Sequence, residues 1–288
     1  MESKKETLQW YRIVLKPLSP LHIGKKNYGV LSETRIFIPG WTIWGAFVNG
    51  YGKLNGGTED AFNNGKRLFE KITCFFPCTS VNDVWFPNFQ KGSLCLGDFS
   101  EQMFRAKYTD VYVSTAINPA HLSAQDTSLH ELEVILPKAK TDEREPIFWQ
   151  GLIGIKLEDE KGFNDMIDKV EEWYVGGEIS YGFGKMKVEN VEKVTNFEED
   201  WGFRKDGTID VGNNMSQKLR NYICFSDAIT LINGKMELIV QYDFTQSFPT
   251  IASQHYGFVP GSKISVSNED EKQRSFVLKK GLFVLEDQ

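Results

Sequence analysis

The order of the expected elements predicts an α+β fold in which an antiparallel sheet carries its helices on one face. A strand pattern followed by a helix opens the chain, and short strand patterns fill its middle. A later helix then leads through a glycine-rich turn into another strand. This spacing suits a split β-α-β arrangement of the ferredoxin-like type. We place this core in residues 1–196 and a β-rich C-terminal segment, which could form a second, partial ferredoxin-like half, in residues 197–288.

The first elements follow from local patterns. Residues 8–18 alternate as a strand does, the polar residues 25–33 indicate a loop, and residues 35–38 indicate a short strand. Residues 41–54 have helical character, with Thr42 as the expected N-cap. Gly45 inside this helix costs about 1 kcal/mol relative to Ala and therefore predicts close packing or the approach of another backbone.

The middle of the chain is less regular. Residues 60–72 favour a second helix, and residues 73–100 are short hydrophobic pieces broken by Pro and Gly. Residues 103–130 are polar and irregular, so we expect a long excursion of the kind that is often functional. Residues 132–135 and 147–157 read as strands.

Residues 163–174 give the clearest helix, because apolar residues recur at i, i+3, i+4 and i+7. This helix runs into a glycine-rich loop and then into a strand over residues 185–194. Residues 196–216 are polar and rich in Gly and Asn, and form the best linker candidate. Three further strand patterns follow, over residues 221–231, 235–244 and 275–285.

Charge and composition narrow the function classes. A net charge of −6 argues against a protein that grips nucleic acid with its whole surface. Residues 1–53 nevertheless carry eight Lys and Arg against three Asp and Glu, so one side is expected to face anions. Neither a membrane span nor a signal peptide is expected, and four cysteines do not suggest a disulfide framework. The expected location is the cytoplasm.

The glycine-rich loop is the most informative segment. Four glycines fall within nine residues, and Lys185 and Lys187 follow at once. Such a loop has N–H groups that can cradle a phosphate. The spacing matches neither a P-loop nor a dinucleotide-binding fingerprint. A tight helix-to-strand turn without a ligand is the alternative interpretation.

Several segments resemble the RAMP superfamily of CRISPR proteins. These are Pro20–Gly24 with the segment Phe37–Phe47, which begins Phe-Ile-Pro-Gly, the strands His130–Ile135 and Phe148–Gly151, and the closing Gly176-Gly177-x4-Gly182-Phe183-Gly184-Lys185. The resemblance covers residues 8–190.

The resemblance implies a modified RNA-recognition fold that binds guide RNA (crRNA) within an effector complex. It also implies other RAMP subunits and a large polymerase-like subunit as partners, indirect contact with target RNA, a prokaryotic cytoplasmic location and no membrane. Amides, basic side chains and stacked rings would hold the strand. The implied RNA-binding residues are His22, Lys25, Lys26, Arg35, Gly40, Trp41, Thr42, Trp44, Gly176, Gly177, Gly182, Gly184, Lys185 and Lys187.

Three features modify this expectation. Trp41 and Trp44 stand where the family often has small hydroxyl or basic residues, so stacking or subunit packing would replace a phosphate grip there. Residues 25–35 contain no Asp, which argues against target cleavage. The segment His255–Ile264 resembles subunits that cap the guide's 5′ tag in type III systems, including the III-D-like branch, and favours that role over a repeated backbone role.

Other functions stay open. His22 and, in the excursion, Asp126 are weak catalytic candidates, so a metal-independent nuclease that processes CRISPR RNA is one alternative. A backbone subunit that cleaves target RNA is another, and an interaction protein without RNA is a third. Cys74, Cys78 and Cys95 are expected to be buried thiols rather than zinc ligands, so we expect no metal and no cofactor.

Overall fold

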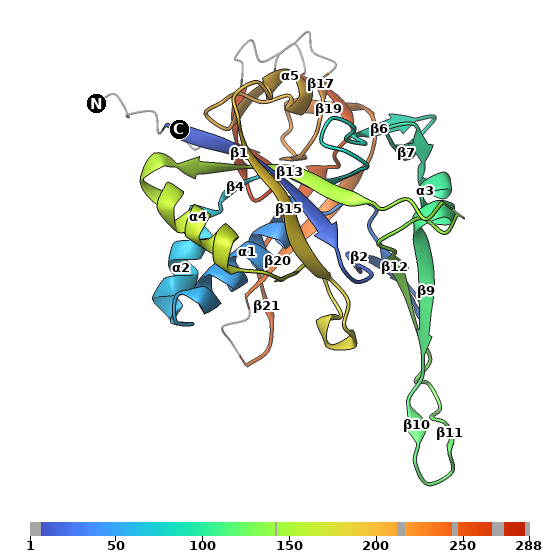
Figure 1. The fold of residues 1–288 in the computed structure, drawn as a ribbon. Helices are drawn as coiled ribbons and strands as arrows, with labels where there is room; N and C mark the ends of the chain where they lie inside the picture. Colours follow the sequence, from blue (N-terminus) through green and yellow to red (C-terminus); the bar gives the residue numbers. More distant parts are fainter. Residues whose placement is uncertain (1–6, 142, 212–216, 244–246, 267–273, 286–288) are drawn as a thin grey trace.

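The computed structural model describes residues 7–141, 143–211, 217–243, 247–266 and 274–285. These residues form a mixed fold in which strands outnumber helices and pair into several sheets (Figure 1). The α+β class is therefore confirmed. No helix within the described ranges is long and apolar enough to cross a membrane.

The central sheet has the order β14-β15-β1-β13-β4, and β5 also pairs with β13. Neighbouring strands in it are antiparallel. The helices α1, α2 and α4 gather on one side of it (Figure 1). Two units, β1-α1-β4 and β13-α4-β15, thus interleave as in a split β-α-β fold. The bounds are β1 Leu8–Pro17, α1 Gly40–Leu54, α2 Glu59–Leu68, β4 Lys71–Ile72, β5 Phe76–Cys78, β13 Phe148–Lys156, α4 Glu160–Lys169, β14 Trp173–Tyr174 and β15 Lys185–Val194.

The alternation along β1 explains its central position. Tyr11 faces the helical layer, where its ring lies 4.7 Å from that of Phe163 in α4. Trp10 points to the other face and packs against Phe197 and Phe203. Strand β1 is therefore covered on both faces near its start. The predicted helix over residues 163–174 ends earlier, because Trp173 pairs with Met186 of β15 as part of β14.

Residues 25–33, expected to be a loop, instead form the hairpin of β2 (Gly24–Tyr28) and β3 (Leu31–Thr34). Residues 35–38 contribute an isolated bridge between Ile38 and Phe75 rather than the expected strand. The excursion over residues 103–130 is also regular. It contains α3 (Glu101–Tyr108), β9 (Thr109–Ser114), β10 (Ile117–Asn118), β11 (Ser123–Ala124) and the start of β12 (His130–Ile135).

Strands β2, β3, β12 and β9 make a second sheet, from which β10 and β11 project as a long arm (Figure 1). Arg105 of α3 holds the base of this sheet, since its guanidinium contacts Glu33 at 2.7 Å, Glu101 at 2.7 Å and Glu133 at 2.5 Å. These contacts join residues far apart in sequence, which local patterns do not reveal.

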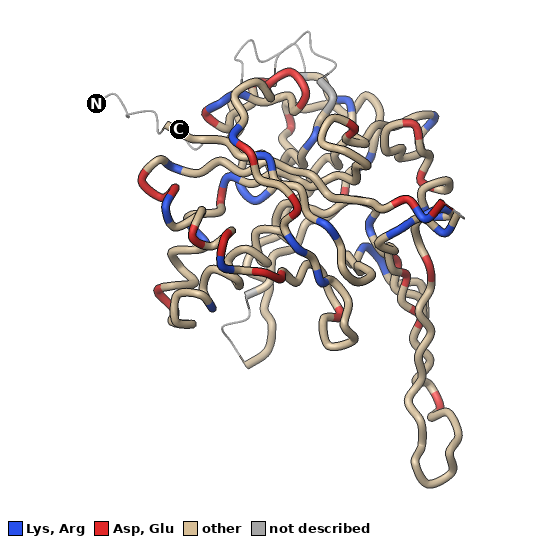
Figure 2. The backbone as a smooth tube through the Cα atoms, viewed as in Figure 1, with Lys and Arg blue, Asp and Glu red and all other residues tan. Residues whose placement is uncertain are grey.

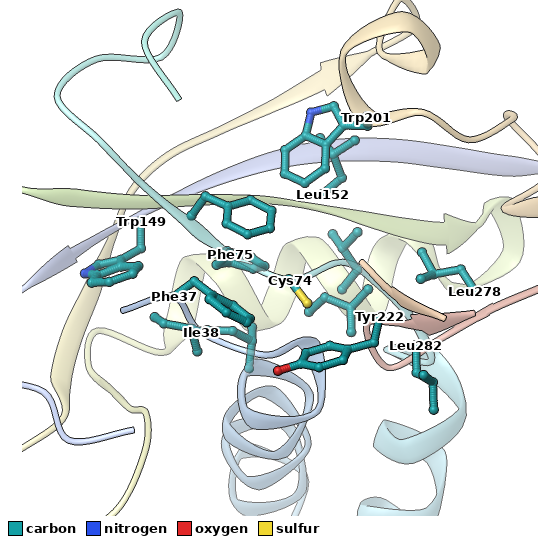
Figure 3. Packing of buried hydrophobic residues seen from close by; sticks show 14 of the residues in the cluster. Phe37, Ile38, Cys74, Phe75, Trp149, Leu152, Trp201, Tyr222, Leu278 and Leu282 are labelled. Carbon is teal, nitrogen blue, oxygen red and sulfur yellow. The ribbon is translucent and has the colours of Figure 1, made fainter. Parts of the chain in front are cut away.

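The C-terminal part shares a core with the rest of the chain. Phe37, Cys74, Tyr222 and Leu278 belong to one buried cluster (Figure 3). Phe197, Trp201 and Phe203, within the predicted linker, are buried in it too, so this part of the segment is not an exposed connection. The division at residue 196 stays a prediction. The remaining elements are β6 Pro87–Gln90, β7 Ser93–Leu96, β8 Phe99–Ser100, α5 Glu198–Trp201, β16 Thr208–Val211, β17 Gln217–Lys218, β18 Tyr222–Cys224, β19 Ile229–Asn233, β20 Met236–Asp243, β21 Thr250–Phe258, β22 Lys263–Val266, β23 Arg274–Lys279 and β24 Leu282–Leu285, with short 3-10 turns at Leu157–Asp159 and Ile179–Tyr181.

Candidate functional site

A backbone hydrogen bond joins the two ends of the glycine-rich loop between β14 and β15. The Val175 amide donates to the carbonyl of Gly184 at 2.8 Å. Gly176 and Gly184 have φ angles of +93° and +81°, and a Cβ atom would lie 2.3 Å from the His22 oxygen at Gly176 and 2.4 Å from the Val175 oxygen at Gly184. These two positions require glycine for both conformation and space. Gly182 has a φ of +83°, but no atom lies within 4 Å of a Cβ placed on it.

The inner side of this loop packs on the segment that follows β1. The Gly184 amide donates to the Pro20 carbonyl at 2.8 Å, and the Gly177 amide donates to the His22 carbonyl at 2.9 Å. The Gly182 amide donates to Ile179 within the loop at 2.9 Å. These amides, expected to face a phosphate, are therefore used to hold the loop in place.

The two catalytic candidates lie on different elements. His22 is 6% exposed, and its Nδ1 lies 2.8 Å from the carbonyl oxygen of Glu133. Because a carbonyl only accepts, Nδ1 is the donor in this bond. His22 thus connects the glycine loop, through its carbonyl bond to the Gly177 amide, with β12, through its ring. Asp126 is exposed, in the turn that follows β11 on the arm.

A groove of about 560 Å³ runs between the glycine loop and the start of α1. The structure therefore brings together the two segments that the sequence singled out. Trp41 and Thr42 contribute from α1, and Gly176 and Gly177 contribute from the loop. Its other lining residues are Ile23, Gly24, Arg35, Pro39, Gly45, Ala46, Asn49, Tyr174 and Ile179.

The first turn of α1 differs from its expected geometry. The N-cap is Pro39, no side chain caps the helix, and the amides of Thr42 and Ile43 contact the Pro39 carbonyl at 3.0 and 3.4 Å. The prediction of Thr42 as the cap is wrong. Thr42 instead lines the groove, where its hydroxyl-bearing side chain adds polar character.

Gly40 and Trp44 have neighbours outside the groove. A Cβ on Gly40 would lie 2.5 Å from the Cα of Gly281, so the helix start touches the β23–β24 turn. The Trp44 indole donates to the Lys66 carbonyl at 3.1 Å, and the Lys280 ammonium lies 4.0 Å from the centre of its ring. Trp41 lies between the two regions, since it lines the groove and its ring is 4.9 Å from that of Tyr222.

The predicted basic residues are mostly neutralised. Arg35 contacts Glu237 at 2.5 Å and the Tyr222 hydroxyl at 3.0 Å. Burial acts to lower the pKa of Arg35, but Tyr222 and Glu237 outweigh it and the pKa is raised, so this guanidinium stays charged. Lys25 contacts Glu33 at 2.9 Å and Glu101 at 3.0 Å.

None of the four predicted lysines is among the residues that line the groove. Lys26 lies on the β2 hairpin, with its ammonium 4.8 Å from the ring centre of Tyr28. On β15, Lys185 contacts Glu172 at 2.6 Å and Lys187 contacts Glu189 at 3.2 Å. Along the backbone, Lys and Arg are interleaved with Asp and Glu (Figure 2).

Gly45 and Asn49 line the groove and were missed as site residues. No atom lies within 4 Å of a Cβ placed on Gly45, so the expectation of close packing or backbone approach there is wrong. Because Gly45 has no side chain, the groove stays open at this position of α1. A signal was present, because Thr42, Gly45 and Asn49 recur at i, i+3 and i+7 on one helix face.

This site offers an open channel walled by backbone, two aromatic rings and small polar side chains. Such a surface can hold a linear chain by shape and by scattered hydrogen bonds. Cys74, Cys78 and Cys95 are buried free thiols. Within the described ranges, no group of three His, Cys, Asp or Glu side chains that could hold a metal ion was found.

Comparisons with known proteins identify the family. Two chains in cryo-EM structures of the type III-B Cmr-beta bound to cognate target RNA, one of them also with AMPPnP, share the fold, each with a TM-score of 0.55 and 14% identity. The match to the structure with target RNA alone covers 96% of this chain and 99% of the other chain. The match to the structure that also contains AMPPnP covers 88% of this chain and 85% of the other chain. No curated protein sequence gives a significant match. The RAMP superfamily model matches residues 14–187, more than half of the sequence, and the chain therefore belongs to the RAMP superfamily.

Proposed function

We propose that this chain is a noncatalytic guide-RNA-binding subunit of a type III CRISPR effector complex. One observation carries the proposal: the start of α1 and the glycine loop, which are far apart in the sequence, line one groove. Both belong to the segments in which the chain resembles RAMP proteins. Membership of that superfamily and the shared fold with chains of the type III-B Cmr-beta support the assignment.

The groove suits a single RNA strand. It lies open between a helix and a loop, and Trp41 and Tyr174 contribute aromatic rings to its lining. Arg35 reaches it already paired with Glu237, so it adds little net attraction for phosphates. Binding in the groove would therefore depend on shape, hydrogen bonds and stacking more than on charge.

The absence of cleavage is part of the proposal. The only carboxylate within residues 25–35 of the sequence is Glu33. Its side chain contacts Lys25 and Arg105 in the ion network at the base of the second sheet. An engaged carboxylate of this kind is poorly placed to act on RNA, which supports a binding role over that of a target-cleaving subunit.

The proposed position is the cap on the guide's 5′ tag, with other RAMP subunits and a large polymerase-like subunit as cytoplasmic partners and with indirect contact to target RNA. This assignment rests on the resemblance of residues 255–264. Within that segment, Gly261 donates to the Leu219 carbonyl at 2.6 Å and Ser262 is fully buried, so the Pro-Gly-Ser turn has a packing role. Any contact to the tag would come from other residues.

Substitution of Gly45 tests the groove. Gly45→Glu places a carboxylate in open space on the groove wall, whereas Gly45→Gln adds the same bulk without charge. With tagged protein from a CRISPR-bearing host, we expect Gly45→Glu to recover at least about tenfold less guide RNA than Gly45→Gln, because like charges repel within the groove. Equal recovery of RNA by both variants and the unchanged protein, or an unchanged protein free of RNA, would contradict the proposal.

A further inference from the structure

A second surface lies on the outer side of the glycine loop, where the loop contacts β9 and β12 of the second sheet. Phe183 is buried with Leu132 and Val134 of β12 in a small hydrophobic cluster that is separate from the main core. The ring of Tyr112, on β9, lies 5.4 Å from that of Phe183 and 6.4 Å from that of Tyr181. Tyr112 and Tyr181 are 47% and 56% exposed. Tyr112 thus contacts both the buried ring of Phe183 and the exposed ring of Tyr181.

A groove of about 480 Å³ adjoins this aromatic cluster. Leu136 connects the two, because it lines the groove and also packs against the cluster of Phe183. The groove runs between the end of β1 and the segment that follows β12. Its side chains include Leu18, Pro137, Lys138, Lys140 and Arg144.

The three cations of this groove differ from the other basic residues at the site. Within the part of the chain that the structure describes, Lys138, Lys140 and Arg144 are exposed, and no ion pair involving them is found. Lys25 and Arg35, in contrast, are each paired with carboxylates. Unpaired cations around a hollow attract anions more strongly than paired ones do.

Among the described residues, no carboxylate lines the groove. Glu145 is paired with Lys107 at 2.8 Å. Glu143 is exposed on the same segment, but it is not among the lining residues. On the adjoining sheet, Lys16 and Lys187 are opposite each other in register and share Glu189, which leaves further positive charge at this edge.

We propose that the outer surface, defined as Tyr112, Tyr181, Lys138, Lys140 and Arg144, binds a second segment of single-stranded RNA. The two tyrosine rings stack on bases, and the three cations contact phosphates. Rings beside cations on one surface are the combination that single strands require. This inference rests on the proposed function and extends the RNA path from the first groove across the glycine loop to the end of β12 that lies away from the arm.

Charge removal tests the phosphate contacts. The purified full chain is titrated with fluorescein-labelled single-stranded oligouridylate at several salt concentrations. The variant K138Q/K140Q/R144Q is compared with K53Q/K161Q/K169Q, which removes three positive charges from α1 and α4. For single strands the salt slope is about 0.7 per phosphate contact, so the first variant is expected to lower it by up to about 2. The control is expected to keep the slope close to that of the unchanged protein.

Ring removal tests the stacking. Tyr181→Ala is expected to weaken oligouridylate binding about tenfold, whereas Tyr181→Phe keeps the ring and most of the affinity. Tyr181 is more than half exposed, so neither change threatens the fold. Equal weakening by the two variants would show that the ring does not stack and would overturn this part of the inference.

The outcomes separate this inference from the proposed function. If Gly45→Glu abolishes oligouridylate binding while K138Q/K140Q/R144Q behaves like its control, the first groove binds RNA and the outer surface does not. If the triple variant lowers the slope while Gly45→Glu has no effect, the outer surface binds RNA and the first groove does not. A triple variant that keeps its RNA affinity but no longer joins other subunits would identify a protein-binding surface and overturn the inference.

Discussion

The two sides of the glycine loop illustrate different uses of the same residue type. On the inner side, Gly176 and Gly184 leave no room for a Cβ, and the loop amides bond to the segment after β1. On the outer side, Gly182 faces open space and Tyr181 is exposed. Glycines that look alike in the sequence therefore serve packing at one side of the loop and accessibility at the other.

The largest expected effect is the loss of stability when the inner side of the glycine loop is disrupted. Gly176→Ala would place a Cβ against the His22 carbonyl in a left-handed conformation, so we expect a loss of about 3 kcal/mol in the free energy of unfolding. Gly182→Ala has the same conformational strain without the contact and should cost about 1 kcal/mol. Urea denaturation of both variants measures the difference. Equal losses would mean that space is not what distinguishes the two sides.

The second sheet, which carries Tyr112 of the outer surface, depends on the ion network around Arg105. Burial acts to raise the pKa of Glu101, but hydrogen bonds from Arg105 and Lys25 outweigh it and hold the pKa below its ordinary value of 4.5. A lowered folded-state pKa stabilises the protein above pH 4.5, and this contribution is lost as the pH falls through the folded-state value. We expect Glu101→Gln to cost about 1–2 kcal/mol at neutral pH.

The measurement is urea denaturation from neutral pH down to about pH 3. Glu101→Gln should lose less stability on acidification than the unchanged protein does. Glu171→Gln, which removes an exposed carboxylate, serves as the control. If the stabilities of Glu101→Gln and Glu171→Gln depend on pH in the same way, the ion network does not stabilise the second sheet through Glu101.

The smallest expected effect sharpens the contrast between the groove and the core. Gly45→Ala adds a methyl group in open space within α1, so we expect the protein to gain about 0.5–1 kcal/mol in stability. Thermal unfolding would record a higher midpoint. A lower midpoint would mean that the backbone at Gly45 is packed more tightly than the structure shows.

Local patterns predicted the elements that carry their own periodicity. The alternation over residues 8–18 and the helical pattern over residues 41–54 agree with β1 and α1 to within one residue at each end. The pattern over residues 185–194 agrees with β15. The hairpin β2–β3 and the helix α3 were missed, because distant partners such as Arg105 with Glu33 and Glu133 stabilise them.

For the candidate site too, the sequence predicted some features and not others. The order of motifs along the chain was sufficient to single out the helix start and the glycine loop, which line one groove. The charge of the opening segment was misleading, because Lys25 and Arg35 find carboxylates at Glu101 and Glu237. Lys138, Lys140 and Arg144 do not stand out in the sequence, since acidic residues are interleaved with them.

The sequence by itself determined the class of fold, the central strands and helices, and the family to which the chain belongs. These depend on periodicity and on glycine and proline positions, which act over a few residues. Only the tertiary structure decided which cations are neutralised, which glycines are confined and which rings are exposed. Those properties depend on contacts between residues that lie tens to hundreds of positions apart, and no local pattern encodes them.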